Sequence, residues 1–281
     1  MDHAVLPSRR ELRSSQADLK QTSLRESVVL VDADNTLWDT DAVFRDAQLL
    51  LVARVEAVVG RISPAADRLD FIRAYDQALA QRHHLHLRYP PQLLVRSVGA
   101  GLAGVPPHAA AQDAIAGKLS TSDPLNQACI ESIVSDYLHA LSQAPMLLPT
   151  VAEGVRTAKE AGLRLYVMTE GRIDKQKRIL ELHCLQAFFE GIWELTKEQA
   201  QFDRVRIRFA GCRVFVIGDQ PDRDIVPAKA AGCSTVLVPS RFKPSWHSSA
   251  AYEAADHVAT DFCEGIRWCV KAAAKHPMKE S

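Results

Sequence analysis

The chain lacks several features that would place it in a specialised class of protein. Its 34 lysines and arginines balance 34 aspartates and glutamates, so the formal net charge at pH 7 is zero. The basic excess of most nucleic-acid-binding proteins is therefore missing. No apolar run approaches the roughly 18–20 residues that cross a bilayer. With 47% apolar and 24% charged residues, the composition predicts a soluble globular protein whose partner is neither a nucleic acid nor a membrane.

Paired cysteine motifs are also missing, although the chain has six cysteines. They are scattered without a Cys-x-x-Cys pair, which favours buried thiols in a reducing cytoplasm over disulfides or a zinc site. Residues 1–26 contain no apolar segment of the kind that secretory signals have, and acidic residues such as Glu11 argue against a transit peptide. We expect residues 1–26 to be a flexible polar extension of a cytoplasmic protein.

What the sequence does contain is an alternation of short apolar segments with helical patterns. The apolar segments are rich in β-branched residues and apolar on both faces, as strands buried in a parallel sheet are. They span residues 28–31, 163–168, 191–195, 214–217 and 234–239. Helical patterns lie between or beside the later segments, at residues 151–161, 173–188, 197–209 and 222–231. The alternation predicts an α/β fold, a doubly wound, Rossmann-like parallel sheet with helices on both faces.

One long segment interrupts this alternation. From residue 40 to residue 144 we find helical runs separated by turn signals and no convincing strand. The runs span residues 42–59, 66–80, 92–102, 108–119 and 124–143. The sequence therefore predicts an all-helical domain at 40–144, inserted into a core made of residues 27–39 and 145–281.

The residues that can carry chemistry follow the predicted strands. Ligands of doubly wound sheets bind at the carboxyl ends of the strands. The candidates at these ends are Asp32, Asp34, Thr169, Glu170, Asp219 and Asp224, with Lys197 opening a helix between two strands. Aspartates are common in turns and helix caps, but several carboxylates at one sheet edge repel each other without a cation. Together with a hydroxyl and a lysine, they suit a divalent metal and a phosphoryl group.

At these residues the sequence resembles the haloacid dehalogenase-like (HAD) superfamily of phosphohydrolases. The matching segments are VVLVDADNT, VMT, the isolated Lys197 and VIGDQPDRD. They occur in the order that the superfamily shows, each motif after its strand, and the resemblance covers nearly the whole chain after residue 26. It implies a Rossmann-like core, and it implies that the helical insert is a cap that closes over the site and selects the substrate.

The resemblance also implies a role for each matching residue. Asp32 corresponds to the nucleophile that forms an aspartyl-phosphate, and Asp34 to the general acid/base. The implied phosphate-binding residues are Thr169, Glu170 and Lys197, and the implied ligands of Mg²⁺ are Asp32, Asp34, Asp219 and Asp224. Dehalogenase members lack an aspartate at the place of Asp34. The resemblance therefore implies a Mg²⁺-dependent phosphatase, a phosphoric monoester hydrolase that acts on a small phosphorylated metabolite.

Alternatives stay open at this point. A phosphotransferase or phosphomutase would pass the phosphoryl group from Asp32 to a hydroxyl other than water. A non-catalytic binding or regulatory protein would keep the fold without turnover. Within the insert, the basic cluster at residues 82–89 either contacts an anionic substrate or is an exposed helix end. Two residues depart from the family pattern, Glu170 where asparagine is frequent and Glu198 where proline often follows the lysine. Neither the substrate nor the oligomeric state follows from the motifs.

Overall fold

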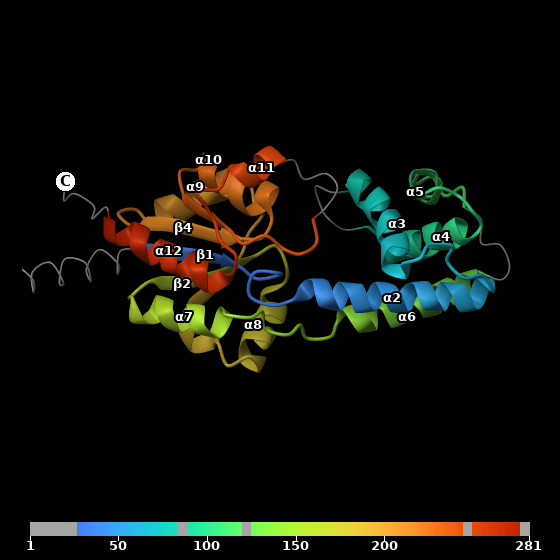
Figure 1. The fold of residues 1–281 in the computed structure, drawn as a ribbon, viewed down its shortest axis with the longest axis horizontal. Coiled ribbons are helices and arrows are strands. Elements are labelled where there is room, and N and C mark those ends of the chain that lie inside the picture. The colour runs from blue at the N-terminus through green and yellow to red at the C-terminus, as the bar shows by residue number, and fades with distance from the viewer. Residues whose placement is uncertain (1–26, 84–88, 120–124, 244–248, 276–281) are drawn as a thin grey trace, which may run out of the picture. The chain divides into compact units, whose positions relative to one another are not determined.

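A computed structural model of the chain describes residues 27–83, 89–119, 125–243 and 249–275 (Figure 1). The chain forms two compact units. Of the described residues, the first contains 27–39, 146–241 and 249–275, and the second contains 40–83, 89–119, 125–145, 242 and 243. The predicted extension at residues 1–26 lies outside the described residues. Among the described residues, no helix is both long enough and apolar enough to cross a membrane.

The first unit is built on a parallel sheet of six strands in the order β3-β2-β1-β4-β5-β6. The strands are β1 Ser27–Asp32, β2 Arg164–Thr169, β3 Phe189–Glu194, β4 Arg213–Gly218, β5 Ser234–Leu237 and β6 His257–Val258. Since β1 lies between β2 and β4, all six of its residues are buried. The five predicted strands are confirmed, although β3 is an edge strand and only half-buried. The two-residue strand β6 was not predicted.

Helices cover both faces of this sheet, as in a doubly wound fold (Figure 1). They are α7 Val151–Glu160, α8 Ile173–Leu182, α9 Gln199–Arg208, α10 Val226–Ala230, α11 Ser249–Glu253 and α12 Phe262–Lys275. Val29 and Val31 of β1 share one apolar cluster with α7, α8 and α12. Val28 and Leu30 share another with α9 and α10. The predicted α/β class is therefore confirmed.

Two predicted helices differ from those observed. The pattern at residues 173–188 predicts one helix, but α8 ends at Leu182 because Cys184 has a left-handed backbone with a φ of 54°. A 3₁₀ turn, Gln186–Phe188, follows. The predicted helix at 222–231 begins as a π-helical turn, Pro221–Ile225, and continues as α10.

The described part of the second unit consists of helices joined by turns and loops. Its helices are α2 Thr40–Val59, α3 Arg68–His83, α4 Pro91–Leu102, α5 Pro107–Ile115 and α6 Gln127–Leu141. Apolar side chains from all five pack into one core, for example Leu51 of α2, Ile72 of α3, Leu94 of α4 and Ile130 of α6. Phe242, which belongs to the same unit, lies against α3, with the guanidinium of Arg73 4.6 Å from its ring centre.

The chain leaves and re-enters the first unit at adjacent points. The backbone N–H of Asp39 donates to the carbonyl of Met146 at 2.8 Å, and that of Leu148 donates to the carbonyl of Leu37 at 3.0 Å. Trp38, between them, is fully buried. The insertion therefore lengthens the chain without separating the two strands on either side of it.

Candidate functional site

The strand ends bring the predicted site residues to one edge of the sheet. Asp32 is the last residue of β1 and Thr169 the last of β2, while Asp219 directly follows β4. Because β2 and β4 are the two neighbours of β1, the three side chains lie at the carboxyl ends of adjacent strands. All three are buried, at 5% exposed or less.

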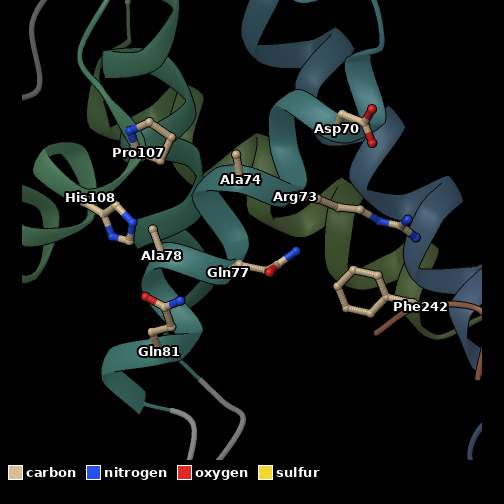
Figure 2. Close-up of a pocket in the computed structure, with 9 residues that line it drawn as sticks. All are labelled: Asp70, Arg73, Ala74, Gln77, Ala78, Gln81, Pro107, His108 and Phe242. Atoms are coloured by element: carbon tan, nitrogen blue, oxygen red, sulfur yellow. The ribbon is translucent and has the colours of Figure 1, made fainter. Parts of the chain in front are cut away.

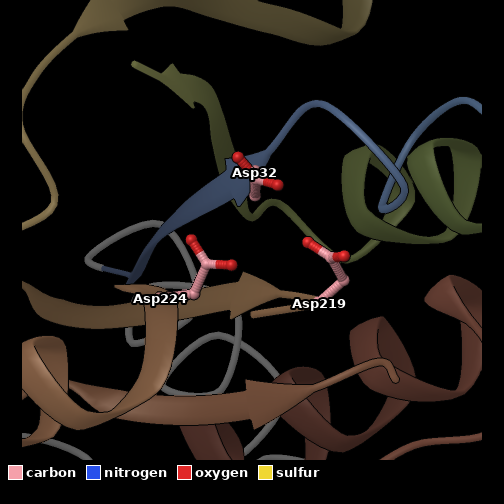
Figure 3. A group of neighbouring side chains, drawn as sticks. All are labelled: Asp32, Asp219 and Asp224. Atoms are coloured by element: carbon pink, nitrogen blue, oxygen red, sulfur yellow. The ribbon is translucent and has the colours of Figure 1, made fainter. Parts of the chain in front are cut away.

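Three aspartates form a compact cluster at this edge. One carboxylate oxygen from each of Asp32, Asp219 and Asp224 lies within 4.8 Å of the others. Figure 3 shows that Asp32 comes from one strand, while Asp219 and Asp224 approach it from the neighbouring one and the turn that follows. Among the described residues this is the group of acidic side chains whose spacing suits a metal ion.

The local backbone explains how Asp224 reaches the cluster. The π-helical turn at Pro221–Ile225 turns the chain back over the end of β4. The Asp224 carboxylate accepts a hydrogen bond from the backbone N–H of Gln220 at 2.9 Å. It lies against Gly218, where a side chain of any other residue would collide with it. π-Helical turns are rare and often occur at functional sites.

Lys197 binds two of the three aspartates. Its Nζ lies 2.6 Å from an Oδ of Asp32 and 2.6 Å from an Oδ of Asp224. These side chains are at most 5% exposed. Lys197 lies between β3 and α9 on the chain, so the lysine enters the site from the end of a fourth strand.

The charged groups of this cluster shift the pKa values of one another. Burial raises the pKa of Asp32 to about 8, and the carboxylates of Asp224 and Asp34 add to this rise, although Lys197 opposes it. Burial lowers the pKa of Lys197, but Asp224 and Asp32 outweigh it, so the pKa of the lysine is raised. Carboxylate oxygens from three aspartates are gathered here, and such hard ligands fit Mg²⁺.

The hydroxyl of Thr169 accepts two hydrogen bonds from neighbouring residues. Its Oγ1 accepts from the backbone N–H of Gly171 at 2.9 Å and from Nε2 of Gln176 at 3.3 Å. A hydroxyl has two acceptor positions and one hydrogen. Both contacts hold the hydroxyl of Thr169 at the end of β2, beside the loop that follows this strand.

Asp34 and Glu170 lie beside this cluster and have other partners. An Oδ of Asp34 accepts from the indole N–H of Trp38 at 3.2 Å, and its side chain is not part of the three-aspartate cluster. The carboxylate of Glu170 pairs with Arg223 and accepts from the backbone N–H of Lys197 at 3.1 Å. The roles of both residues in binding metal or phosphate stay predictions.

Sequence reasoning missed Gln176, and it expected an ion pair for Arg223 without identifying Glu170 as the partner. Gln176 is 1% exposed and lies on α8, where a glutamine at a helical position looks like an ordinary surface residue. Arg223 follows Asp222 in a charged segment, which is typical of solvated side chains. The available signal was the position of Arg223 within the motif segment VIGDQPDRD, which places it near the site.

The basic cluster at residues 82–89 is described only at its ends, because residues 84–88 lie outside the described residues. At one end, the hydroxyl of Tyr89 donates to Asp76 on α3. Tyr89, at the end of the predicted cluster, is therefore hydrogen-bonded within the helical unit.

A separate pocket of about 520 Å³ lies within the helical unit (Figure 2). Its lining comes mainly from one side of α3, with Phe242 and the first residues of α5 completing it. The lining residues are Asp70, Arg73, Ala74, Gln77, Ala78, Gln81, Pro107, His108 and Phe242. This volume is in the range of small-molecule pockets.

Comparisons with known proteins agree on the fold. Residues 27–232 match the family model described as haloacid dehalogenase-like hydrolase. The comparison with curated proteins gave no match. Two solved structures described as dehalogenases share the fold. Three further solved structures share it as well.

YfnB from Bacillus subtilis, described as a HAD-hydrolase and bound to magnesium, has a TM-score of 0.57 and 17% identity over 86% of this chain and 98% of its own. A predicted phosphoglycolate phosphatase from Haemophilus somnus 129PT has a TM-score of 0.54 and 18% identity over 86% and 97%. A protein from Thermotoga maritima described as a beta-phosphoglucomutase has a TM-score of 0.52 and 18% identity over 88% and 99%. At these identities the likeness shows the fold alone.

Proposed function

The chain belongs to the haloacid dehalogenase-like hydrolases, and within this family we propose that it is a Mg²⁺-dependent phosphatase of a small phosphorylated metabolite. The observation that carries the proposal is the buried cluster of Asp32, Asp219 and Asp224 around Lys197. Such a cluster combines a carboxylate nucleophile with groups that hold a cation and a phosphoryl oxygen. The bound magnesium described for YfnB supports the same choice of metal.

Asp32 is the nucleophile in this proposal. Its carboxylate attacks phosphorus, the bond from phosphorus to the ester oxygen breaks, and the phosphoryl group is carried on Asp32. Mg²⁺, held by Asp32, Asp219, Asp224 and the backbone carbonyl of Asp34, would neutralise the negative charge of the phosphoryl oxygens. Lys197 and the hydroxyl of Thr169 bind those oxygens as their charge changes.

Asp34 is the general acid and then the general base. It protonates the departing ester oxygen, and it afterwards takes a proton from the water that attacks the aspartyl-phosphate. The indole N–H of Trp38, 3.2 Å from an Oδ of Asp34, holds this side chain next to the nucleophile's strand end. An acid at this place favours phosphoester chemistry over dehalogenation, because a leaving alkoxide needs a proton and a halide does not.

The helical unit is the cap in this proposal, and the unit with the parallel sheet is the catalytic core. The contribution of the cap would be to exclude bulk water before transfer and to select the substrate. The pocket along α3 carries Arg73, Gln77 and His108, which suit a polar organic group.

Hydrolysis of an aryl phosphate in the presence of Mg²⁺ tests the phosphatase proposal. We expect turnover that EDTA abolishes and that Asp32→Asn reduces by at least about 1,000-fold, because removal of the nucleophile leaves no covalent route. Asp203→Asn, an exposed aspartate on α9, is the matched control and should keep the wild-type rate. Turnover that survives Asp32→Asn or EDTA would exclude this mechanism.

Transfer to a hydroxyl other than water is the second candidate, and the shared fold with a protein described as a beta-phosphoglucomutase favours considering it. Product analysis with a sugar phosphate separates the two reactions. Release of inorganic phosphate in equal amount to the substrate consumed supports hydrolysis, whereas an isomeric sugar phosphate or a second phosphoester supports transfer.

A further inference from the structure

The carboxylate of Glu170 contacts two other segments of the site. Glu170 directly follows β2, and its Oε1 accepts a hydrogen bond from the backbone N–H of Lys197 at 3.1 Å. Its Oε2 accepts from Nε of Arg223 at 2.9 Å, and a second guanidinium nitrogen of Arg223 bonds Oε1. One side chain thereby joins the loop after β2 to the segment before α9 and to the π-helical turn after β4.

One residue that Glu170 contacts, Lys197, belongs to the buried ion pair, and the other, Arg223, is next to a member of that pair in the chain. The backbone N–H of Lys197 donates a hydrogen bond to Glu170, and its ammonium forms ion pairs with Asp32 and Asp224. Arg223 is the residue before Asp224 in the chain. The Glu170 carboxylate therefore holds the chain on both sides of the contact between Lys197 and Asp224.

The charge of Glu170 is paired with these protein groups. A carboxylate next to a phosphoryl group would repel it, since both are negative. The forked contact with Arg223 instead neutralises the carboxylate, and such bidentate pairs are strong and geometrically specific. The side chains of Glu170 and Arg223 are 27% and 16% exposed. Solvent therefore screens this ion pair less than it would on an open surface.

We propose that Glu170 is a positioning residue that fixes the ammonium of Lys197 between Asp32 and Asp224. The effect on catalysis rests on the proposed function, whereas the effect on the placement of Lys197 does not. Without the carboxylate, the backbone N–H of Lys197 loses this acceptor and the segment before α9 is held less firmly. A displacement of about 1 Å in a catalytic group costs on the order of 100-fold in rate.

Steady-state kinetics of Glu170→Ala with an aryl phosphate and Mg²⁺ test the catalytic part. We expect kcat to fall about 10- to 100-fold and KM to stay within about threefold, because the change does not touch the substrate. Glu170→Gln keeps an oxygen that accepts from the Lys197 N–H and should recover part of kcat. Glu198→Ala removes an exposed carboxylate next to Lys197 and should match the wild type. Wild-type kcat in Glu170→Ala, or a raised KM with unchanged kcat, would overturn the proposal.

Acylation of lysine amines, followed by mass spectrometry, tests the placement of Lys197 without any turnover. The Lys197 side chain is 5% exposed, so it should react slowly in the wild type and in Glu198→Ala. We expect faster acylation of Lys197 in Glu170→Ala and an intermediate rate in Glu170→Gln. Equal rates in all four proteins would overturn the proposal. A wild type that does not hydrolyse aryl phosphate would refute the proposed function, and the acylation rates would still decide this inference.

Thermal unfolding of each variant accompanies both measurements. If Glu170→Ala does not fold, Glu170→Gln carries the test, with kcat expected to fall at least threefold below that of Glu198→Ala and Lys197 acylation expected to be faster. Glu170→Gln that equals Glu198→Ala in both measurements would then overturn the proposal.

Discussion

The candidate site requires glycine at position 218, because even the methyl group of an alanine would not fit there. In Gly218→Ala the new Cβ would collide with the carboxyl group of Asp224, which is fully buried and bonded to Lys197. We expect kcat for an aryl phosphate to fall about 10- to 100-fold. The free energy of unfolding should also fall by about 1–3 kcal/mol, the usual cost of overpacking. Kinetics and urea unfolding measure the two effects.

Gly191→Ala is the matched control for this substitution. A Cβ at Gly191 would meet Tyr166 at 3.5 Å, an ordinary contact distance, so both quantities should stay close to those of the wild type. Equal activity in the two variants would mean that the carboxyl group of Asp224 moves aside without affecting the site.

At the residue scale, the sequence identified side chains by their place after strands but not by their partners. Asp32, Thr169 and Asp219 were predictable because each ends or follows a strand whose apolar pattern is clear. The contact of Gln176 with Thr169 and that of Arg223 with Glu170 depend on how separate segments pack. No local pattern in the sequence encodes such a contact.

At the scale of elements, the edge strand β6 is held to β5 partly by a carboxylate. Asp256 accepts from the backbone N–H of Thr235 at 2.8 Å and lies 3.0 Å from Nζ of Lys229. Burial alone would raise the pKa of Asp256, but the Thr235 N–H and the Lys229 ammonium outweigh it, so the pKa is lowered. A lowered pKa in the folded state stabilises the fold above the unfolded-state pKa, and this contribution is lost as the pH falls through the folded-state pKa.

Asp256→Asn tests this contribution by urea unfolding at several pH values. At pH 7 we expect the variant to lose about 1 kcal/mol of unfolding free energy, a value kept small because the pair is partly exposed. The difference from the wild type should shrink as the pH falls below about 4, where the aspartate of the unfolded chain is already protonated. A difference that is the same at pH 7 and pH 3 would show that the charge of Asp256 does not matter.

The strands were more predictable than the ends of helices. Buried parallel strands such as β1 and β4 have continuous β-branched runs that few other elements share. The end of α8 was not predictable, because Cys184 takes a left-handed backbone that a cysteine seldom adopts. The two-residue strand β6 is too short to give a pattern, and it forms because β5 offers it an edge.

At the scale of the whole molecule, the cluster of Asp32, Asp219 and Asp224 predicts a stability that depends on Mg²⁺. An ion that binds only the folded protein raises the free energy of unfolding, by about 2.7 kcal/mol at a concentration of 100 times its Kd. We expect the thermal unfolding midpoint to rise with Mg²⁺ in the wild type and in Asp203→Asn. In Asp219→Asn, which removes one member of the aspartate cluster, the rise should be much smaller.

The same variant should behave differently without metal. Because removing one of three mutually repelling carboxylates relieves their repulsion, Asp219→Asn in EDTA should unfold at a midpoint no lower than that of the wild type. A lower midpoint in EDTA, or an equal response to Mg²⁺, would argue against this cluster as the metal site.

The central position of β1 has a consequence for synthesis on the ribosome. β1 ends at Asp32, but its two partners begin only at Arg164 and Arg213. At about 5–20 residues per second, this largely apolar strand is made on the order of ten seconds before either of its neighbours in the sheet. The intervening helices are complete before β2 is made. Since the chain enters and leaves them at Asp39 and Met146, which bond to each other, early folding of these helices would deliver β2 beside the waiting strand.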